Sequence, residues 1–500
     1  MGLYAKIRET VTEAAVFGIA PLVTSLTGFL LTFVYAKYLG PGDLGHLALL
    51  LATEAFATQL LGIGMTQAYF RSYFDDESEE RRRVITGTTL WFLVGVNLVF
   101  ALASFPFAGW YAALIKIPDV RLVQLVIVLT AIDTVNTVPF LILKAARRSK
   151  VYVGVKWIAG LAQFLAIVAL VAVFKLGVTG ALIGWVVGTA LQTVIYFSLL
   201  RGSFSFVFSF TELKPMLALG VPMVFNALAT KVLITADRFF INHYSTAKEV
   251  GLYELANKFA SILPILITNP FSLIWPAMRF QVSKDEDAGE YYSLVLTYLT
   301  FLSLFFGLGV AVLVPELIHI TLREEYWGAI PVVPLFVLYY LLVATGKGVN
   351  VGLMTERKAY WNPIIVSAAA AVNIALNFLL IPRFGIIGAG WATVIAYLFM
   401  NWFRWYMSNK YLPIAYDWGR IVKLLVVAFA MYAVIVLLPI GNHYVSFAVR
   451  FGIAACFPFV LATLRFYDER EISRLSELWR AGRRRAVRVV KRNSKGASEK

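Results

Sequence analysis

Cysteine, histidine and phosphate-binding loops are scarce in this chain or missing from it. The one cysteine, Cys456, lies inside an apolar run, so the chain has no disulfide framework and the thiol implies no redox role. The four histidines include no clustered pair suited to a metal ion, so neither a metal centre nor another cofactor is expected. No glycine-rich loop of the Walker type is present, which argues against direct use of ATP.

Charged residues are also few. Only 15% of the 500 residues are charged, whereas 60% are hydrophobic and the mean hydropathy is +0.75. A water-soluble core of ordinary composition cannot bury that much apolar surface. Apolar runs of about 20 residues, long enough to cross a hydrocarbon layer as helices, follow one another along almost the whole chain. We count fourteen, which begin near Ala14, Asp43, Ile85, Leu122, Ile158, Gly177, Met216, Val250, Tyr291, Gly328, Trp361, Gly385, Leu424 and Phe451.

These runs predict an all-α polytopic membrane protein with about fourteen transmembrane helices. The loops between them are too short to hold a soluble catalytic domain, so we predict a transporter and not an enzyme. The first run is too long for a cleavable signal peptide and lacks a small-residue cleavage site.

Lysine and arginine fall unevenly on the two sides of the predicted helices. Most of those in loops, Lys156 among them, lie on the side that holds the N-terminus, and few lie on the opposite side. Because cytoplasmic loops are enriched in Lys and Arg, we expect both termini in the cytoplasm. The sequence thus predicts a multi-pass protein of the cell membrane, that is, the cytoplasmic or inner membrane.

The sequence also contains an internal repeat. Residues 175–181 (KLGVTGA) return as residues 383–389 (RFGIIGA), 208 positions later. Further pairs keep nearly the same offset: Lys150-Val151-Tyr152 with Lys358-Ala359-Tyr360, Arg71 with Arg279, and Asp43-Leu44-Gly45 with Glu249-Val250-Gly251. Self-similarity at one period indicates an internal duplication. Since the repeats are six spans apart, the two halves should be related by an axis along the membrane normal.

The net charge of +16 would suggest a nucleic-acid partner in a soluble protein. Here the excess lies on the expected cytoplasmic loops and the tail, so we predict no nucleic-acid binding. Residues 468–492 carry apolar residues near helical spacing, followed by an arginine cluster. This pattern predicts a helix on an anionic leaflet, and a disordered basic tail is the alternative.

Polar residues inside the apolar runs are the candidate functional residues. An ionisable side chain at the bilayer centre costs about 2.5–3.5 kcal/mol, so it is expected to face a wet interior. Helical geometry puts Lys231, Thr235 and Arg238 on one stripe of the seventh span. A neighbouring stripe and the second, fourth and eighth spans add Asn226, Thr230, Asp237, Glu54, Asp133, Glu254, Asn257 and Lys258.

Several of these residues also have a purely structural interpretation. Glu254 and Lys258 are spaced to neutralise one another on one helix face. Asp237 and Arg238 lie near the outer end of their span, where an interfacial anchor is as good an interpretation as a ligand site. Lys231 lies too deep in its span to reach the headgroups.

Short motifs along the chain resemble one known family. These are LGPGDLG at residues 39–45, GVP at 220–222, ADRFF at 236–240 and EVGLY at 249–253. They look like the polysaccharide-transporter branch, the O-antigen-type flippases, of the multidrug/oligosaccharidyl-lipid/polysaccharide (MOP) exporter superfamily. The resemblance covers nearly the full chain, although each motif is short.

The resemblance implies two pseudo-symmetric six-helix lobes, at residues 1–210 and 211–410, then two helices at 411–467 and a basic cytoplasmic tail at 468–500. It implies a flippase that moves polyprenyl-pyrophosphate-linked oligosaccharide from the cytoplasmic to the outer leaflet by alternating access. Partners would be that lipid-linked oligosaccharide, anionic membrane lipids at the tail, and polysaccharide polymerase or assembly proteins.

Roles for the candidate residues follow from that substrate. Cations would meet the phosphates: Lys231, Arg238 and Lys258. Amides would meet the sugars: Asn226, Asn257, Asn373 and Asn377. Carboxylates would couple transport to protons or sodium: Glu54, Asp133, Asp237 and Glu254. The glycan and the coupling ion stay open.

Three rival functions remain. A multidrug or cation antiporter of the same superfamily usually lacks the last two helices and favours an acidic cavity, whereas this chain has deep cations. A lipid II flippase carries arginines in its first helix, and residues 14–36 contain none. A membrane glycan polymerase or ligase usually has a large outer loop, and the longest here is residues 108–121.

Overall fold

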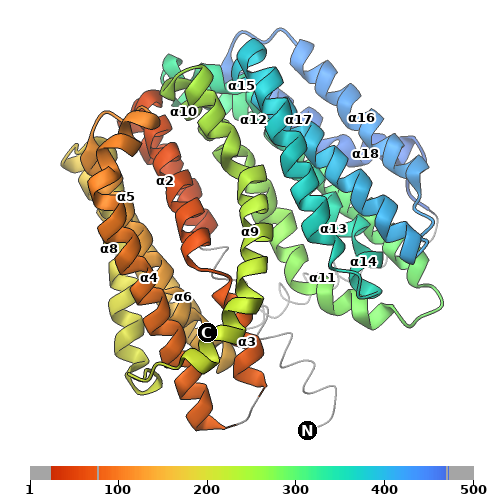
Figure 1. Cartoon of the computed structure of the whole chain (residues 1–500). Coiled ribbons are helices and arrows are strands. Elements are labelled where there is room, and N and C mark those ends of the chain that lie inside the picture. The colour runs from red at the N-terminus through yellow and green to blue at the C-terminus, as the bar shows by residue number, and fades with distance from the viewer. Residues whose placement is uncertain (1–23, 76–77, 469–470, 472–500) are drawn as a thin grey trace, which may run out of the picture.

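The computed structural model describes residues 24–75, 78–468 and 471. Every regular element in this part of the chain is a helix (Figure 1). The start of the first predicted span and the tail after residue 471 lie outside the described residues, so the predicted membrane-surface helix of the tail stays a prediction.

The first lobe contains a helix at residues 24–38 and the elements that follow it to residue 199. These are α2 (Pro41–Leu61), α3 (Met65–Phe74), α4 (Glu79–Leu114), α5 (Val120–Val135), α6 (Thr137–Ala145), α7 (Ser149–Val168), η1 (Ala169–Val173) and α8 (Gly177–Leu199). A short turn, η2 (Arg201–Ser203), leads into the second lobe.

The second lobe repeats this order of elements. It contains α9 (Phe210–Tyr244), α10 (Ala247–Ala260), η3 (Pro264–Thr268), α11 (Asn269–Val282), α12 (Ala288–Thr321), η4 (Glu324–Val332), α13 (Val333–Val349), α14 (Val351–Thr355) and α15 (Trp361–Tyr411). The C-terminal helices α16 (Trp418–Leu437), α17 (His443–Ala455) and α18 (Phe457–Thr463) pack against α12 at the side of this lobe (Figure 1).

Within the described residues, twelve helical segments are long and apolar enough to cross a membrane. One of them, α15, has 51 residues, but Gly385 within it has φ 55° and ψ −136°, so two helices meet there. An unbroken helix of that length would measure about 76 Å, far more than a bilayer core. Dividing α15 and adding the helix at residues 24–38 accounts for the difference from the predicted fourteen. The predicted all-α fold with two lobes and a C-terminal pair is confirmed.

The duplication is visible in the backbone. Gly177 and Gly385, which the sequence repeat pairs, both adopt left-handed φ, 58° and 55°. The turns before α7 and α15 also match, because Arg148 N–H and Lys358 N–H each donate to the carbonyl five residues earlier at 2.8 Å. This turn relates Arg148 to Lys358, so the sequence pairing of Lys150 with Lys358 is wrong by two residues.

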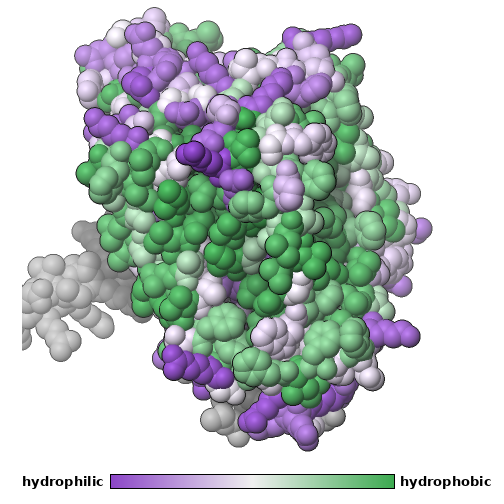
Figure 2. Space-filling view, turned by 60° about the vertical axis from the view of Figure 1, so that its left-hand side comes forward, coloured by the Kyte–Doolittle hydropathy of each residue, from purple (hydrophilic) through white to green (hydrophobic). Residues whose placement is uncertain are grey.

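A hydrophobic band lies between two hydrophilic ends on the face shown in Figure 2. Large apolar side chains point outward from the described helices, such as Leu437 at 79% and Phe459 at 72% exposure. Each Å² of such surface is worth about 25 cal/mol when removed from water, so these faces require lipid. The molecule is a multi-pass membrane protein.

Helix α9 runs between the two lobes (Figure 1). Its first turns, with Leu213 and Met216, belong to the core of the first lobe. Farther along, Leu233 and Ile241 belong to the large cluster that joins both lobes. The helix therefore links the lobes, and the predicted lobe boundary after residue 210 stays a prediction.

Candidate functional site

A cavity of about 180 Å³ lies between the lobes. One wall comes from the helix at residues 24–38, α2 and α8, and the other from α9 and α10. The first wall is mostly apolar. The second wall presents Thr235, Arg238, Glu254 and Lys258. The fold thus brings together at one cavity three of the residues that the sequence singled out as ionisable candidates.

Arg238 is held in a buried network of ion pairs. Its Nε and Nη2 donate to Glu254 Oε2 at 3.0 and 2.7 Å, and its Nη1 donates to Asp237 Oδ1 at 3.0 Å. The Tyr253 hydroxyl donates to the second oxygen of Asp237. The side chains of Arg238 and Asp237 are only 8% and 4% exposed. Mutual pairing offsets the cost of burying these charges, and it leaves Arg238 few free donors for a ligand.

Lys258 is the accessible cation of this group. Its Nζ lies 3.4 Å from Glu254 Oε1, and its side chain is 41% exposed. An i,i+4 pair of this kind is worth only about 0.3–0.5 kcal/mol, and Glu254 is already neutralised by Arg238. An anionic group that enters the cavity can therefore replace Glu254 as the partner of Lys258 at little cost in free energy.

Lys231 and the carboxylates Glu54 and Asp133 interact electrostatically where α2, α5 and α9 meet. The charge of Glu54 interacts with those of Asp133 and Lys231, and the charge of Asp133 interacts with Lys231 and Lys156. By sequence Lys156 is predicted in a cytoplasmic loop, and this prediction is wrong. Helix α7 begins at Ser149, before the most apolar part of the run, and so carries Lys156 into the lobe.

The four candidate asparagines do not line the cavity in this conformation. Asn377 Nδ2 donates to Asn373 Oδ1 at 3.1 Å, and both side chains are buried. Asn257 Oδ1 accepts a hydrogen bond from the Tyr340 hydroxyl at 2.9 Å. Asn226 lies on α9, and its Oδ1 is buried without a hydrogen-bond partner. Their roles toward sugars stay predictions.

The lobes touch backbone to backbone where α2 crosses α10. A Cβ added to Gly45 would lie 1.7 Å from the Ala247 carbonyl oxygen, and one added to Gly251 would lie 1.8 Å from the Pro41 carbonyl oxygen. The contact is reciprocal, as expected for repeats related by a pseudo-twofold axis. We call this end of the bundle the outer end, after the predicted orientation. The sequence showed these glycines as a repeat pair but not as a contact.

A hydrogen-bonded latch joins the lobes beside this crossing. Lys116 Nζ, in the α4–α5 loop of the first lobe, donates to the carbonyl oxygens of Asn242 and His243 at 3.0 and 3.2 Å. Asn242 Nδ2 donates in return to the Ile115 carbonyl at 2.7 Å. The α4–α5 loop is thus fastened to the end of α9.

A second latch occupies the related position of the other repeat. Arg323 Nη2 and the Tyr326 hydroxyl donate to the Leu39 carbonyl oxygen at 2.6 and 2.8 Å. Arg323 lies 208 positions after Ile115, the same offset as the sequence repeat. Sequence reasoning missed both latches because their acceptors are backbone carbonyls, which carry no residue-type signal. Together they close the outer end in this conformation.

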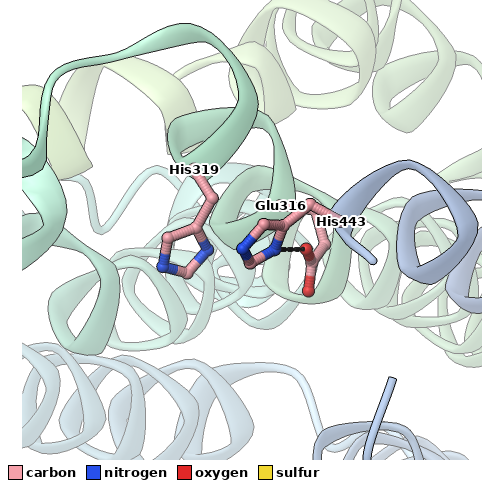
Figure 3. Close-up of side chains that lie close together, drawn as sticks. All are labelled: Glu316, His319 and His443. Carbon is pink, nitrogen blue, oxygen red and sulfur yellow. Dashed lines mark hydrogen bonds and ion pairs between the residues drawn. The ribbon is translucent and has the colours of Figure 1, made fainter. Parts of the chain in front are cut away.

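A cluster of Glu316, His319 and His443 also lies at the outer end (Figure 3). His443 Nδ1 is 2.7 Å from Glu316 Oε2, and the two imidazole rings stack with centroids 4.5 Å apart. The expectation that no histidines cluster is therefore wrong, since the fold brings α12 and α17 together. The Glu316 carboxylate also accepts from Ser446 and pairs with Arg450, each at 3.0 Å. It thus joins α17 to α12 as a buried staple.

Removing this staple is expected to destabilise the C-terminal pair. Glu316→Ala leaves Arg450 and its neighbours without their buried acceptor, which lowers the free energy of unfolding by about 3–5 kcal/mol. Thermal unfolding of the detergent-purified protein would show a lower midpoint. Glu290→Ala, at an exposed position of the same helix, is the control and should leave the midpoint unchanged. Equal midpoints for both variants would contradict the staple.

Comparisons with known proteins agree with this architecture. A family model described as "Polysaccharide biosynthesis protein" matches residues 34–331. The succinoglycan biosynthesis transport protein ExoT of Rhizobium meliloti (strain 1021) is 22% identical over 270 residues, which cover 53% of this chain and 53% of that protein. The match thus spans about half the length of this curated relative.

Solved structures show the same fold. The lipid II flippase MurJ in an inward closed conformation gives a TM-score of 0.74 at 14% identity, covering 90% of this chain and 99% of that chain. An inward-facing multidrug resistance MATE transporter of the MOP superfamily gives 0.64 at 13% identity, covering 79% and 97%. At such identities the likeness concerns the fold alone.

The two lobes with a charged cavity between them define a multi-pass membrane protein with the fold of these solved flippases and transporters. The chain belongs to the polysaccharide biosynthesis protein family, whose model covers more than half of its length. The membership that the four short motifs predicted is confirmed. By their names, the relative and the structural neighbours are transporters and flippases.

Proposed function

We propose that this protein is a flippase that moves polyprenyl-pyrophosphate-linked oligosaccharide from the cytoplasmic to the outer leaflet, for the biosynthesis of cell-surface polysaccharide. The observation that carries the proposal is the accessible cation Lys258 in the cavity between the lobes. The family description and the relative's name support the polysaccharide pathway.

The chemistry of the substrate explains the design of the site. A hydroxyl or amide moved into hydrocarbon without a hydrogen bond costs about 2–7 kcal/mol, and a charged pyrophosphate costs far more. A cavity with an available cation lowers that barrier for the headgroup. At about 180 Å³ the cavity is smaller than the sites of about 300–1,000 Å³ that enclose ordinary ligands. A headgroup that carries several sugars does not fit in this volume, so transport requires the lobes to rock apart.

Lys258→Ala is expected to slow transport at least about tenfold while the protein stays folded, because the lost charge is weakly paired. Transport would be measured as the arrival of lipid-linked oligosaccharide on the far leaflet of vesicles that contain the purified protein. Lys258→Arg should keep most activity. Lys248→Ala, at an exposed position of the same helix, is the matched control. Wild-type rates for Lys258→Ala would remove this residue from the site.

A second candidate is flipping of lipid II. The MurJ likeness extends over almost the full length of both chains, and lipid II carries the same type of anionic, polyprenyl-linked headgroup. The same vesicles loaded with lipid II distinguish the two candidates. Transport of lipid II alone would favour the second. A drug or cation antiporter has less support, because the accessible charge in the cavity is positive. A membrane glycan polymerase or ligase also has less support, because the relative's name is that of a transport protein.

Coupling to a proton or sodium ion is part of the proposal. Asp237 and Glu254 are already bound to Arg238. Glu54 is not among the partners of Arg238. It accepts a hydrogen bond from Thr58 at 2.8 Å, and Asp133 lies near it. These two carboxylates are the better coupling candidates. We also propose a location in the cytoplasmic (inner) membrane, with both termini in the cytoplasm and polymerase or assembly proteins as partners.

A further inference from the structure

A large apolar groove lies beside the central cavity. It has a volume of about 690 Å³ and runs between α2, α4 and α5 of the first lobe and α9. Within the described chain no charged side chain lines it, and two of its few polar groups, Thr53 and the Tyr111 hydroxyl, share a hydrogen bond of 2.7 Å. Phe107 and Trp110 form its rim and are 64% and 66% exposed, so the groove opens toward the lipid.

The groove and the cavity share two walls, α2 and α9. Consecutive residues of a helix point about 100° apart, so each helix faces the two spaces with different residues. On α9, Arg238 lines the cavity and Phe239 lines the groove. On α2, Ala55 lines the cavity and Phe56 lines the groove. The Phe56 and Phe239 rings meet between the lobes with centroids 6.1 Å apart. This aromatic pair separates a charged space from an apolar one.

The pseudo-twofold axis creates a second seam between the lobes. Phe33 lies 206 positions before Phe239, the offset of the Gly45 and Gly251 pair, and its ring meets Phe259 of α10 at 5.7 Å. The cleft at this seam has a volume of only about 350 Å³, and α17 covers it with Phe447 and Phe451. The C-terminal helices therefore break the symmetry, and the α2–α9 seam keeps the larger apolar groove.

We propose that the α2–α9 groove holds the polyisoprenyl chain of the substrate while the pyrophosphate headgroup stands in the central cavity. This inference rests on the proposed function. A lipid-linked sugar is charged at one end and apolar at the other, and the two sides of α9 match that division, with Arg238 at the cavity and Phe239 at the groove. The chain passes between Phe56 and Phe239, which part as the lobes rock. A groove fitted to the chain gives the transporter selectivity for the length of the lipid.

The test compares two ligands that share a headgroup and differ in tail length, undecaprenyl pyrophosphate and farnesyl pyrophosphate. Binding to the full-length protein in detergent is expected to be at least about tenfold tighter for the long tail. Ala103→Trp and Ala57→Trp each place a large ring in the groove. Both should reduce this ratio to about threefold or less while they leave farnesyl pyrophosphate binding unchanged, which also verifies that the variants fold.

The control fills the other cleft. Gly309 lines it, and a Cβ there would meet nothing within 4 Å, so Gly309→Trp should leave the ratio as in the wild type. An unchanged ratio in both groove variants would overturn the groove proposal alone. Loss of the wild-type long-tail preference on adding excess phosphatidylglycerol would also overturn it, since ordinary acyl chains would then occupy the groove. A wild-type protein that binds neither pyrophosphate would overturn the proposed function as well.

Discussion

Arg238→Ala is expected to destabilise the second lobe strongly. The substitution leaves Asp237 and Glu254 buried without the guanidinium that neutralises both. Removing one partner of a buried ion pair costs about 3–5 kcal/mol, a large part of the stability of a typical protein. Thermal unfolding in detergent should show a strongly lowered midpoint, and the yield of monodisperse protein should fall.

Replacing the whole network by neutral residues distinguishes the effect of buried charge on stability from the effect of side-chain shape. Arg238→Met combined with Asp237→Asn and Glu254→Gln removes every charge of the buried pairs, so stability should return toward the wild type. Transport should not return if the network also positions Lys258 through Glu254. A single Arg238→Ala variant as stable as the wild type would show that the carboxylates are solvated, contrary to their burial.

Gly45→Leu is expected to hold the outer end of the transporter open. A Cβ at this position would lie 1.7 Å from the Ala247 carbonyl oxygen, so α2 and α10 cannot cross as they do here. The closed conformation therefore loses stability relative to the open one, and transport should stop. Gly42→Leu is the matched control on the same helix, because a Cβ there meets nothing within 4 Å.

Thiol labelling measures this opening directly. The chain has one native cysteine, so Cys456→Ser provides a background for a reporter at Thr32→Cys, which lines the central cavity. An impermeant thiol reagent added at the outer side should label the reporter in Gly45→Leu and spare it in Gly42→Leu. Equal protection in both variants would show that the glycine crossing is not the outer gate.

The long apolar runs and the internal repeat could be predicted because both are patterns along the sequence. A helix that crosses a bilayer must be apolar for about 20 residues, so thirteen of the predicted spans begin within described helices or next to their ends. The repeat was visible in part because glycine is favoured where φ is positive, as at Gly177 and Gly385. The hydropathy pattern wrongly placed Lys156 in a loop. Hydropathy shows which part of a helix faces lipid, but it does not show where the helix begins.

The candidate site was predictable in its residue types but not in its division of roles. In sequence, Arg238 and Lys258 are both cations within apolar runs and candidates for phosphate binding. Only the packing of α9 against α10 shows that the first is enclosed by two carboxylates and the second remains accessible.

The sequence by itself determined the solvent, the number of spans to within a few, the duplication and the family, because each of these depends on residues close together along the chain or at a fixed period. Tertiary structure alone decided which charges neutralise one another, which glycines bring the lobes into contact, and which of the two related seams stays open. Those features depend on pairs of residues from different helices, often held by backbone carbonyls, and a linear pattern of side chains does not specify such pairs.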